Sequence, residues 1–239
     1  MRADAARLRE HLALSNQLHE TYLENRDRLD AYRRFVDLQV AYFLPKYEDL
    51  RSRPGYSEAI DYIISDMVGP TIAARDAELA KVVPMMSRVL PSGALQALAT
   101  ALELNATILR INLDIETLLR DEIVRGAPIS ERDYCVASRE AATLDDCLRL
   151  IAMTRKAGES LERIVRIPMI GSTLRMMRGP ARLVGVTDLH EFLVRGYTIF
   201  RAIDDVPEFL NTVEARMTSV FTRVFEAPVD ALAVDNIQY

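Results

Sequence analysis

An acidic run near the C-terminus, from Asp204 to Glu208, has the residue types and spacing of a magnesium site. Carboxylates grouped on one helical turn can hold magnesium through their oxygen atoms. The same run also fits a helix start, because an N-cap aspartate, Pro207 in the first turn and an acidic residue after it are typical of that position. No second acidic motif of this kind occurs in the sequence, so we expect a helix start.

The histidines and cysteines lack the spacing of a metal site. The histidines are His11, His19 and His190, and no two of them form an HxxxH pair. Cys135 and Cys147 are twelve residues apart, which matches no zinc pair. We therefore expect no metal, no cofactor, and two reduced, buried thiols of a cytoplasmic protein. No complete catalytic motif is present, so an enzyme is the less favoured interpretation.

His190 follows Thr187 by three residues, in the first turn of an expected helix. Free backbone amides at a helix start favour anions, which makes His190 a candidate for binding an anionic ligand or for acid–base chemistry. An ordinary surface histidine is the alternative.

Basic residues are concentrated between Arg149 and Arg182, where eight basic and two acidic residues give a local charge of +6 in a protein of net charge −5. Such a segment can recognise an anion, an acidic protein or a membrane surface. The acidic stretch that begins at Asp204 can instead neutralise it within the fold. The candidates for a recognition surface are Arg163, Arg166, Arg175 and Arg178.

A line of polar residues, Asn105, Asn112 and Glu116, runs beside apolar positions on the longest expected helix. Polar groups next to a core either meet solvent or need partners, and a pocket supplies partners. These residues are therefore a solvated flank of the helix or the wall of a binding pocket.

The overall charge and hydropathy exclude several classes of protein. With a pI near 5.4, the whole molecule has no attraction for nucleic acid. No stretch of 18 apolar residues exists, so we expect no transmembrane segment, and the N-terminus lacks the apolar run of a secretory signal. These observations agree with a cytoplasmic location.

Apolar residues recur at three- and four-residue steps almost throughout, which predicts an all-α fold of about eight helices. We expect one domain over residues 1–226 and an irregular arm over 227–239. A long central helix over about 94–123 should bury Leu104, Ile108, Ile111, Ile115 and Leu118. Pro45 should kink or break the second helix, and Ser92, Ser130 and Thr143 should cap three others.

Two stretches, IDYIISDMVGP from Ile60 and ARDAELAKVVPMMSRVLP from Ala74, resemble the proteobacterial family named for an FFLEELY motif. IPMIG from Ile167 and LRMMRGPA from Leu174 are also similar to it, and the likeness covers about residues 30 to 225. The namesake motif departs from the pattern, because Ser65 and Asp66 stand where the family has two adjacent glutamates. The resemblance implies an all-helical bacterial protein.

His19, followed by Leu29, Tyr32 and Phe35, resembles the opening helices of haem-oxygenase-like proteins, in which a histidine faces a pocket. One interpretation is therefore a helical enzyme with a pocket near His19. We favour a cytoplasmic bacterial binding protein that recognises a partner protein or an amphipathic or anionic small molecule between its helices. It can also form a homo-oligomer.

Overall fold

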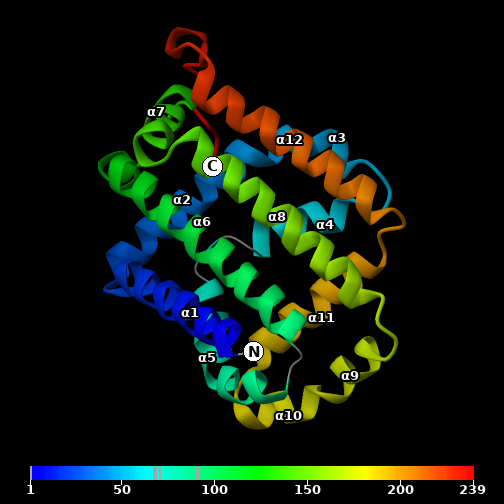
Figure 1. Ribbon diagram of the computed structural model, residues 1–239. Helices are drawn as coiled ribbons and strands as arrows, with labels where there is room; N and C mark the ends of the chain where they lie inside the picture. Colours follow the sequence, from blue (N-terminus) through cyan, green and yellow to red (C-terminus); the bar gives the residue numbers. More distant parts are fainter. Residues whose placement is uncertain (1, 67–68, 70, 90–91) are drawn as a thin grey trace.

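The computed structural model describes residues 2–66, 69, 71–89 and 92–239, and these residues form helices with no β-strand (Figure 1). The N-terminal helices are α1 (Arg2–Leu23), α2 (Arg26–Phe43), α3 (Glu48–Arg51), α4 (Ser57–Asp61) and α5 (Thr71–Val89). The others are α6 (Ser92–Arg125), α7 (Glu131–Ala141), α8 (Leu144–Val165), α9 (Ile170–Met176), α10 (Arg178–Val184), α11 (Thr187–Arg201) and α12 (Val206–Glu226). The predicted all-α class is confirmed.

The chain is divided into more helices than the eight that we expected. Pro45 breaks the second one as predicted, so that α2 is followed by the 3-10 turn Leu44–Tyr47 and by α3. The helix that begins at Ser57 changes after Asp61 into a π-helical turn, Tyr62–Asp66. Pro180 lies in the first turn of α10, where a missing amide hydrogen costs no bond.

Capping side chains begin several helices where the sequence predicted. Ser130 and Thr143 both form complete capping boxes, at the starts of α7 and α8. Asp205 caps α12 by accepting a hydrogen bond from the backbone amide of Glu208, which confirms the acidic run as a helix start. Ser92 lies among the residues whose side chains are not described.

Helix α6, with 34 residues, is the long central helix and packs against α1, α2, α7 and α8 (Figure 1). Leu104, Ile111 and Ile115 on it are buried as predicted. The prediction for Leu118 is wrong, because Leu118 is 40% exposed and Leu119 is buried instead. A period of 3.6 residues allows either position after Ile115, and the packing of α6 selects Leu119.

The core consists of apolar clusters that share helices. One cluster joins α2, α6 and α7 and contains Phe35, Leu38 and Ile123. Another joins α4, α11 and α12 around Phe200 and Phe209. No helix in the described part of the chain is long and apolar enough to cross a membrane.

The C-terminal tail beyond residue 226 is mostly irregular, as expected, but it is held against the body. It contains a 3-10 turn, Val229–Ala231, and it buries Leu232. The amide of Ile237 donates to the carbonyl of Ile129 at 2.9 Å, and the amide of Arg132 donates to the carbonyl of Ala233 at 3.1 Å. The tail therefore covers the start of α7.

Candidate ligand-binding cavity

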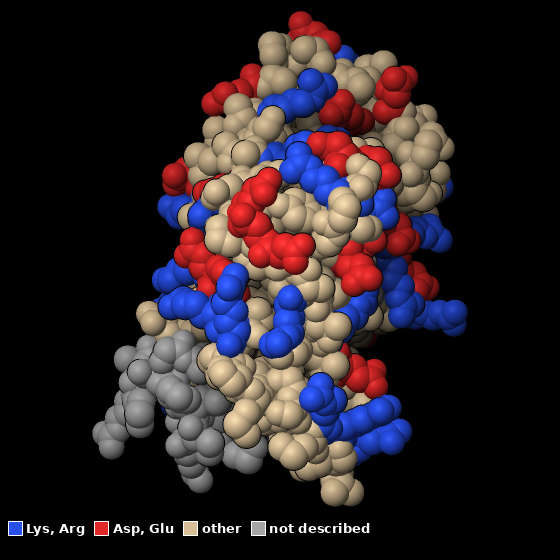
Figure 2. All heavy atoms as spheres, turned by 90° about the vertical axis from the view of Figure 1, so that its right-hand side faces the viewer, with Lys and Arg blue, Asp and Glu red and all other residues tan. Residues whose placement is uncertain are grey.

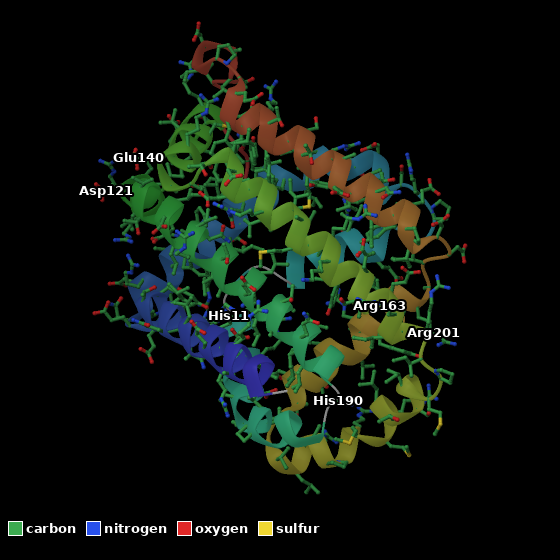
Figure 3. All side chains as sticks on the ribbon, viewed as in Figure 1. His11, Asp121, Glu140, Arg163, His190 and Arg201 are labelled. Carbon is green, nitrogen blue, oxygen red and sulfur yellow. The ribbon has the colours of Figure 1, made fainter. Side chains whose placement is uncertain are left out.

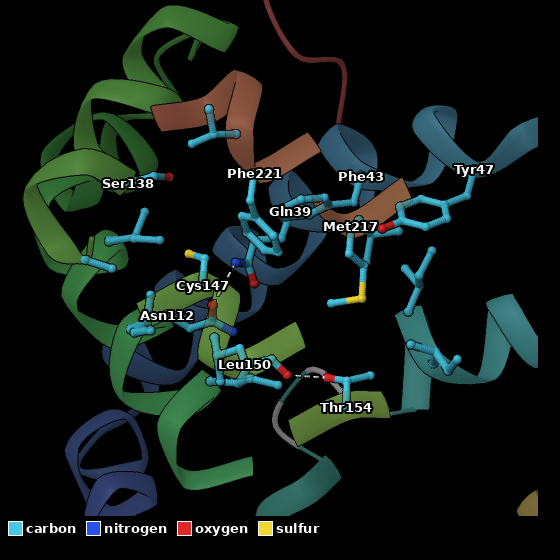
Figure 4. Close-up of a pocket in the computed structure, with 18 of the residues that line it drawn as sticks. Gln39, Phe43, Tyr47, Asn112, Ser138, Cys147, Leu150, Thr154, Met217 and Phe221 are labelled. Carbon is cyan, nitrogen blue, oxygen red and sulfur yellow. Dashed lines mark hydrogen bonds between the residues drawn. The ribbon is translucent and has the colours of Figure 1, made fainter. Parts of the chain in front are cut away.

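A cavity of about 220 Å³ lies within the bundle between α2, α6, α8 and α12 (Figure 4). Residues 60–64 and α7, through Tyr134 and Ser138, contribute to the remaining sides. Most of the lining is aliphatic or aromatic, with Phe43, Ile111, Leu150, Met217 and Phe221 as examples. Such a site suits an apolar molecule.

Gln39 brings the main polar group into this apolar lining. Its side chain is only 7% exposed, and its Nε2 donates to Asn112 Oδ1 at 2.8 Å and to the Tyr134 hydroxyl at 3.2 Å. The other end of the amide, Oε1, is buried and accepts no hydrogen bond from any described residue. Figure 4 shows the side chain of Gln39 among the lining residues, with its bond to Asn112 dashed. A buried acceptor without a donor costs about 1–3 kcal/mol.

The remaining polar groups of the lining are already engaged or neutral. Ser138 donates to the carbonyl of Tyr134 at 2.7 Å, and Thr154 donates to the carbonyl of Leu150 at 2.8 Å. Burial raises the pKa of the Cys147 thiol to about 11, so this group stays protonated at neutral pH. Burial also raises the pKa of Tyr134. The cavity wall is therefore uncharged.

The structure separates the three residues that the sequence placed on one polar line. Asn112 is 5% exposed and lines the cavity. Glu116 is buried outside the cavity. It forms one ion pair with Arg120 at 2.9 Å and a second with Arg28 at 3.7 Å. Asn105 points to a different polar cluster. The line is not a continuous pocket wall, because Asn112 and Glu116 meet different residues of α2, Gln39 and Arg28, whereas Asn105 faces α1 and α5.

That second cluster centres on His19 and Asp76, which join α1 to α5. His19 Nε2 lies 3.0 Å from Asp76 Oδ2, and its Nδ1 lies 2.7 Å from the Tyr22 hydroxyl. Ser15 donates to the same carboxylate oxygen at 2.5 Å, and Asn105 donates to it at 3.4 Å. His19 does not line the cavity, and both of its ring nitrogens have partners.

Within the basic segment, some arginines have carboxylate partners and others have none among the described residues. Arg149 pairs with Asp145 and Asp146, Arg155 with Glu159 and Glu214, and Arg166 with Glu162. Arg163 donates to the Glu159 carbonyl and to the Ser160 hydroxyl. Arg175, Arg178 and Arg182 are exposed and have no ion pair or hydrogen bond within the described part of the chain.

The expected neutralisation by Asp204, Asp205 and Glu208 is absent from the described contacts of this segment. Asp205 caps a helix, and Glu208 lies 4.0 Å from Arg53. Glu214, farther along α12, supplies the one acidic partner from that stretch, to Arg155. The face seen in Figure 2, on the side of α9 in Figure 1, shows basic side chains beside a broad uncharged surface in its lower part.

His190 holds two helices together. Its Nε2 donates to the carbonyl of Leu174 at 2.7 Å, which ties α9 to α11. Figure 3 shows that His190 lies apart from Arg163, which is near Arg201 at the edge of the molecule. His190 therefore lies against α9 and away from Arg163, and it does not line the cavity.

Two site residues, Gln39 and Asp76, were missed by reasoning from the sequence. Gln39 carried a visible signal, because it is an amide four residues after Phe35 in an otherwise apolar stripe of the second helix. Asp76 carried none, since a carboxylate in a charged helix is usually solvated. Within the described residues, no group of three or more His, Cys, Asp or Glu side chains is placed to hold a metal ion.

Comparison with known proteins gives a family and no activity. No curated protein and no solved structure matches the chain. A family model described as a domain of unknown function (DUF8198) matches residues 16–231. This match spans the cavity, the His19 cluster and the basic segment, and the chain belongs to the DUF8198 family.

Proposed function

We propose that this protein binds a small, largely apolar molecule with one hydrogen-bond donor in the cavity between α2, α6, α8 and α12. The observation that carries the proposal is the unpaired Oε1 of Gln39 in an otherwise apolar lining. It refines the binding role expected from the sequence, and the ligand is held between helices. An activity at His19 has less support, because that side chain is enclosed by its own partners.

The size of the cavity limits the ligand. At about 220 Å³, it is roughly half as large again as a protein cavity that holds one benzene molecule. A fused pair of aromatic rings or a short branched chain is of suitable size. A longer lipid needs more room than the cavity offers.

The chemistry of the lining sets the polarity of the ligand. A buried water is held stably when it has two to four polar partners. Ser138 and Thr154 already donate their hydroxyl hydrogens to backbone carbonyls, so neither has a hydrogen left to donate to a water. A charged ligand would lose its hydration without gaining a counter-charge. A neutral molecule with one hydroxyl or amine therefore fits best, with its donor directed to Gln39.

Naphthalene and 1-naphthol make a matched pair of probes, because they differ by one hydroxyl. We expect both to bind, and 1-naphthol to bind about three- to tenfold more tightly, since a neutral hydrogen bond contributes about 0.5–1.5 kcal/mol. Isothermal titration calorimetry measures both affinities. Failure of both probes to bind would contradict the proposal.

The variant Gln39→Met keeps the length of the side chain and removes its acceptor. It should lower the affinity for 1-naphthol to that for naphthalene and leave naphthalene binding nearly unchanged. The variant Ile108→Phe, which fills part of the cavity, should weaken both probes. Circular dichroism checks that each variant is folded, and an undiminished preference for 1-naphthol in Gln39→Met would exclude Gln39 as the acceptor.

The location and assembly of the protein belong to the same proposal. Both cysteines are buried and free, which is the usual state of thiols in a reducing compartment. We therefore keep the cytoplasm of a bacterium as the proposed location. Binding of a partner protein and formation of a homo-oligomer stay predictions, which light scattering of the purified protein tests.

A further inference from the structure

The segment from Ile167 to Val184, which contains α9 and α10, exposes an unusual share of apolar surface. Of the sixteen large apolar side chains that are exposed among the described residues, six lie in this segment: Ile167, Met169, Met176, Met177, Leu183 and Val184. Leu183 is 89% exposed and Met169 is 74% exposed. Clustered exposed apolar residues mark an interaction surface, whereas single ones are ordinary.

The charge of this segment has one sign. Between Arg163 and Thr187 the sequence has five arginines and no acidic residue. The three arginines of the exposed segment, Arg175, Arg178 and Arg182, have no ion pair or hydrogen bond to any described residue. By contrast, Arg149 and Arg155 on α8 and Arg166 at its end all have carboxylate partners. The arginines of the segment therefore lack the carboxylate partners that Arg149, Arg155 and Arg166 have.

The segment is firmly attached to the body. His190 binds the carbonyl of Leu174, and Lys81 donates to the carbonyl of Gly185 at 3.0 Å. A Cβ at Gly171 would lie 2.7 Å from the Tyr197 hydroxyl, so α9 and α11 are in close contact. Ala181 and Val186 are buried. The exposed side chains are thus presented by a fixed scaffold at the edge of the bundle (Figure 1).

We propose that the segment from Ile167 to Val184 docks on an anionic membrane surface. A bilayer interface supplies both complements at once, since its phosphates meet the arginines and its acyl region takes up the methionines, Leu183 and Val184. Arginine side chains can keep their charged ends at the level of the phosphates while their stems lie against apolar groups. This surface is separate from the cavity, so the proposal stands independently of the proposed function.

Vesicle co-sedimentation of the full chain tests the proposal. Vesicles of equal parts phosphatidylglycerol and phosphatidylcholine should bind the protein, and vesicles of phosphatidylcholine alone should bind it much more weakly. Binding should weaken as salt is raised to about 1 M, where charges are screened within about 3 Å. Equal binding to both vesicles, or binding to neither, would overturn the proposal.

Two matched pairs of variants locate the surface. Arg175→Gln with Arg178→Gln should weaken vesicle binding by roughly ten- to thirtyfold, whereas Arg149→Gln with Arg166→Gln changes the net charge equally and should have little effect. Leu183→Ser should weaken binding, and Val124→Ser, which changes an exposed side chain of α6, should not.

Circular dichroism and the melting temperature show that each variant is folded. Equal losses within either matched pair would overturn the proposal, because the effect would not be local to the segment. Soluble polyglutamate distinguishes the other anionic source. If polyglutamate binds and anionic vesicles do not, the arginines serve an acidic protein and the membrane proposal is wrong.

Discussion

His19 and Asp76 are 57 residues apart in the sequence, and their side chains meet at 3.0 Å between α1 and α5. Both are almost completely buried, at 3% and 5% exposure. Ser15 and Tyr22 add hydrogen bonds to this pair. A buried polar group costs free energy unless its partners are in place, so the cluster fixes how the first helix lies against the fifth.

The first prediction concerns this cluster. Asp76→Ala should lower the free energy of unfolding by about 3–5 kcal/mol, because it leaves His19 buried without its carboxylate partner. Ser15→Ala should cost less, about 1–3 kcal/mol. Urea unfolding followed by circular dichroism measures both. Asp114→Ala on the exposed side of α6 is the control and should change stability by less than about 1 kcal/mol, and a similar small effect for Asp76→Ala would contradict the structural role.

The second prediction concerns acid stability. Hydrogen bonds from Thr143 and Arg149 lower the pKa of Asp146 from 3.8 to about 2. A carboxyl whose pKa is lowered by folding stabilises the fold at pH values above its pKa in the unfolded chain. This contribution is lost as the pH falls from about 4 to about 2. After allowance for solvent screening, we expect about 1 kcal/mol from this group.

The variant Asp146→Asn isolates this contribution. It should be less stable than the wild type at neutral pH, and the difference should shrink as the pH approaches 2. Urea midpoints measured at several pH values give the comparison. A stability difference that stays constant over this range would show that Asp146 does not contribute through its charge.

Much of the fold could be predicted from the sequence because its signals are local. Capping residues such as Ser130 and Thr143 act on amides within three residues, and Pro45 acts on its own turn. The choice between Leu118 and Leu119 is not local, since it depends on how α6 rotates against its neighbours. Helix α10 was not expected, because Gly179-Pro180 was interpreted as a boundary, whereas proline is tolerated in the first turn of a helix.

The site could be predicted less well, since it depends on contacts between distant residues. Asn112 was a candidate, but its partner Gln39 is 73 residues away and pairs with it only in the fold. The arginines show the same limit. Their number was visible in the sequence, whereas the split between the paired Arg166 and the unpaired Arg175 depends on where carboxylates lie in space.

The third prediction uses two glycines in opposite environments. Gly158 on α8 is buried, and a Cβ there would overlap the side chain of Leu210 on α12. Gly158→Ala should therefore destabilise the protein by about 1–3 kcal/mol from overpacking, despite a gain of up to about 1 kcal/mol in helix propensity.

Gly179 in α10 is the matched control. It is exposed, and a Cβ there would meet nothing within 4 Å, so Gly179→Ala should be neutral or stabilising by up to about 1 kcal/mol. Thermal unfolding compares the two variants. Equal effects would mean that α8 and α12 are not as closely packed as Leu210 indicates.

The fourth prediction uses Cys147 as a reporter of the cavity. Its thiol lines the cavity, and burial raises its pKa to about 11. Because the thiolate is the reactive form, alkylation at neutral pH should be slower than that of an exposed cysteine by roughly a hundredfold or more. The rate should rise with pH toward that value and should fall when 1-naphthol occupies the cavity.

The variant Cys135→Ser leaves Cys147 as the one thiol in the chain, so the measured rate belongs to the cavity alone. Mass spectrometry after timed exposure to iodoacetamide gives this rate. Burial alone slows alkylation whether or not the ligand is present. If alkylation is slow and 1-naphthol does not change its rate, the thiol is buried but the prediction that 1-naphthol covers it is wrong. Protection by 1-naphthol that is lost in Gln39→Met at the same ligand concentration would place the bound hydroxyl at Gln39 and the rings beside Cys147.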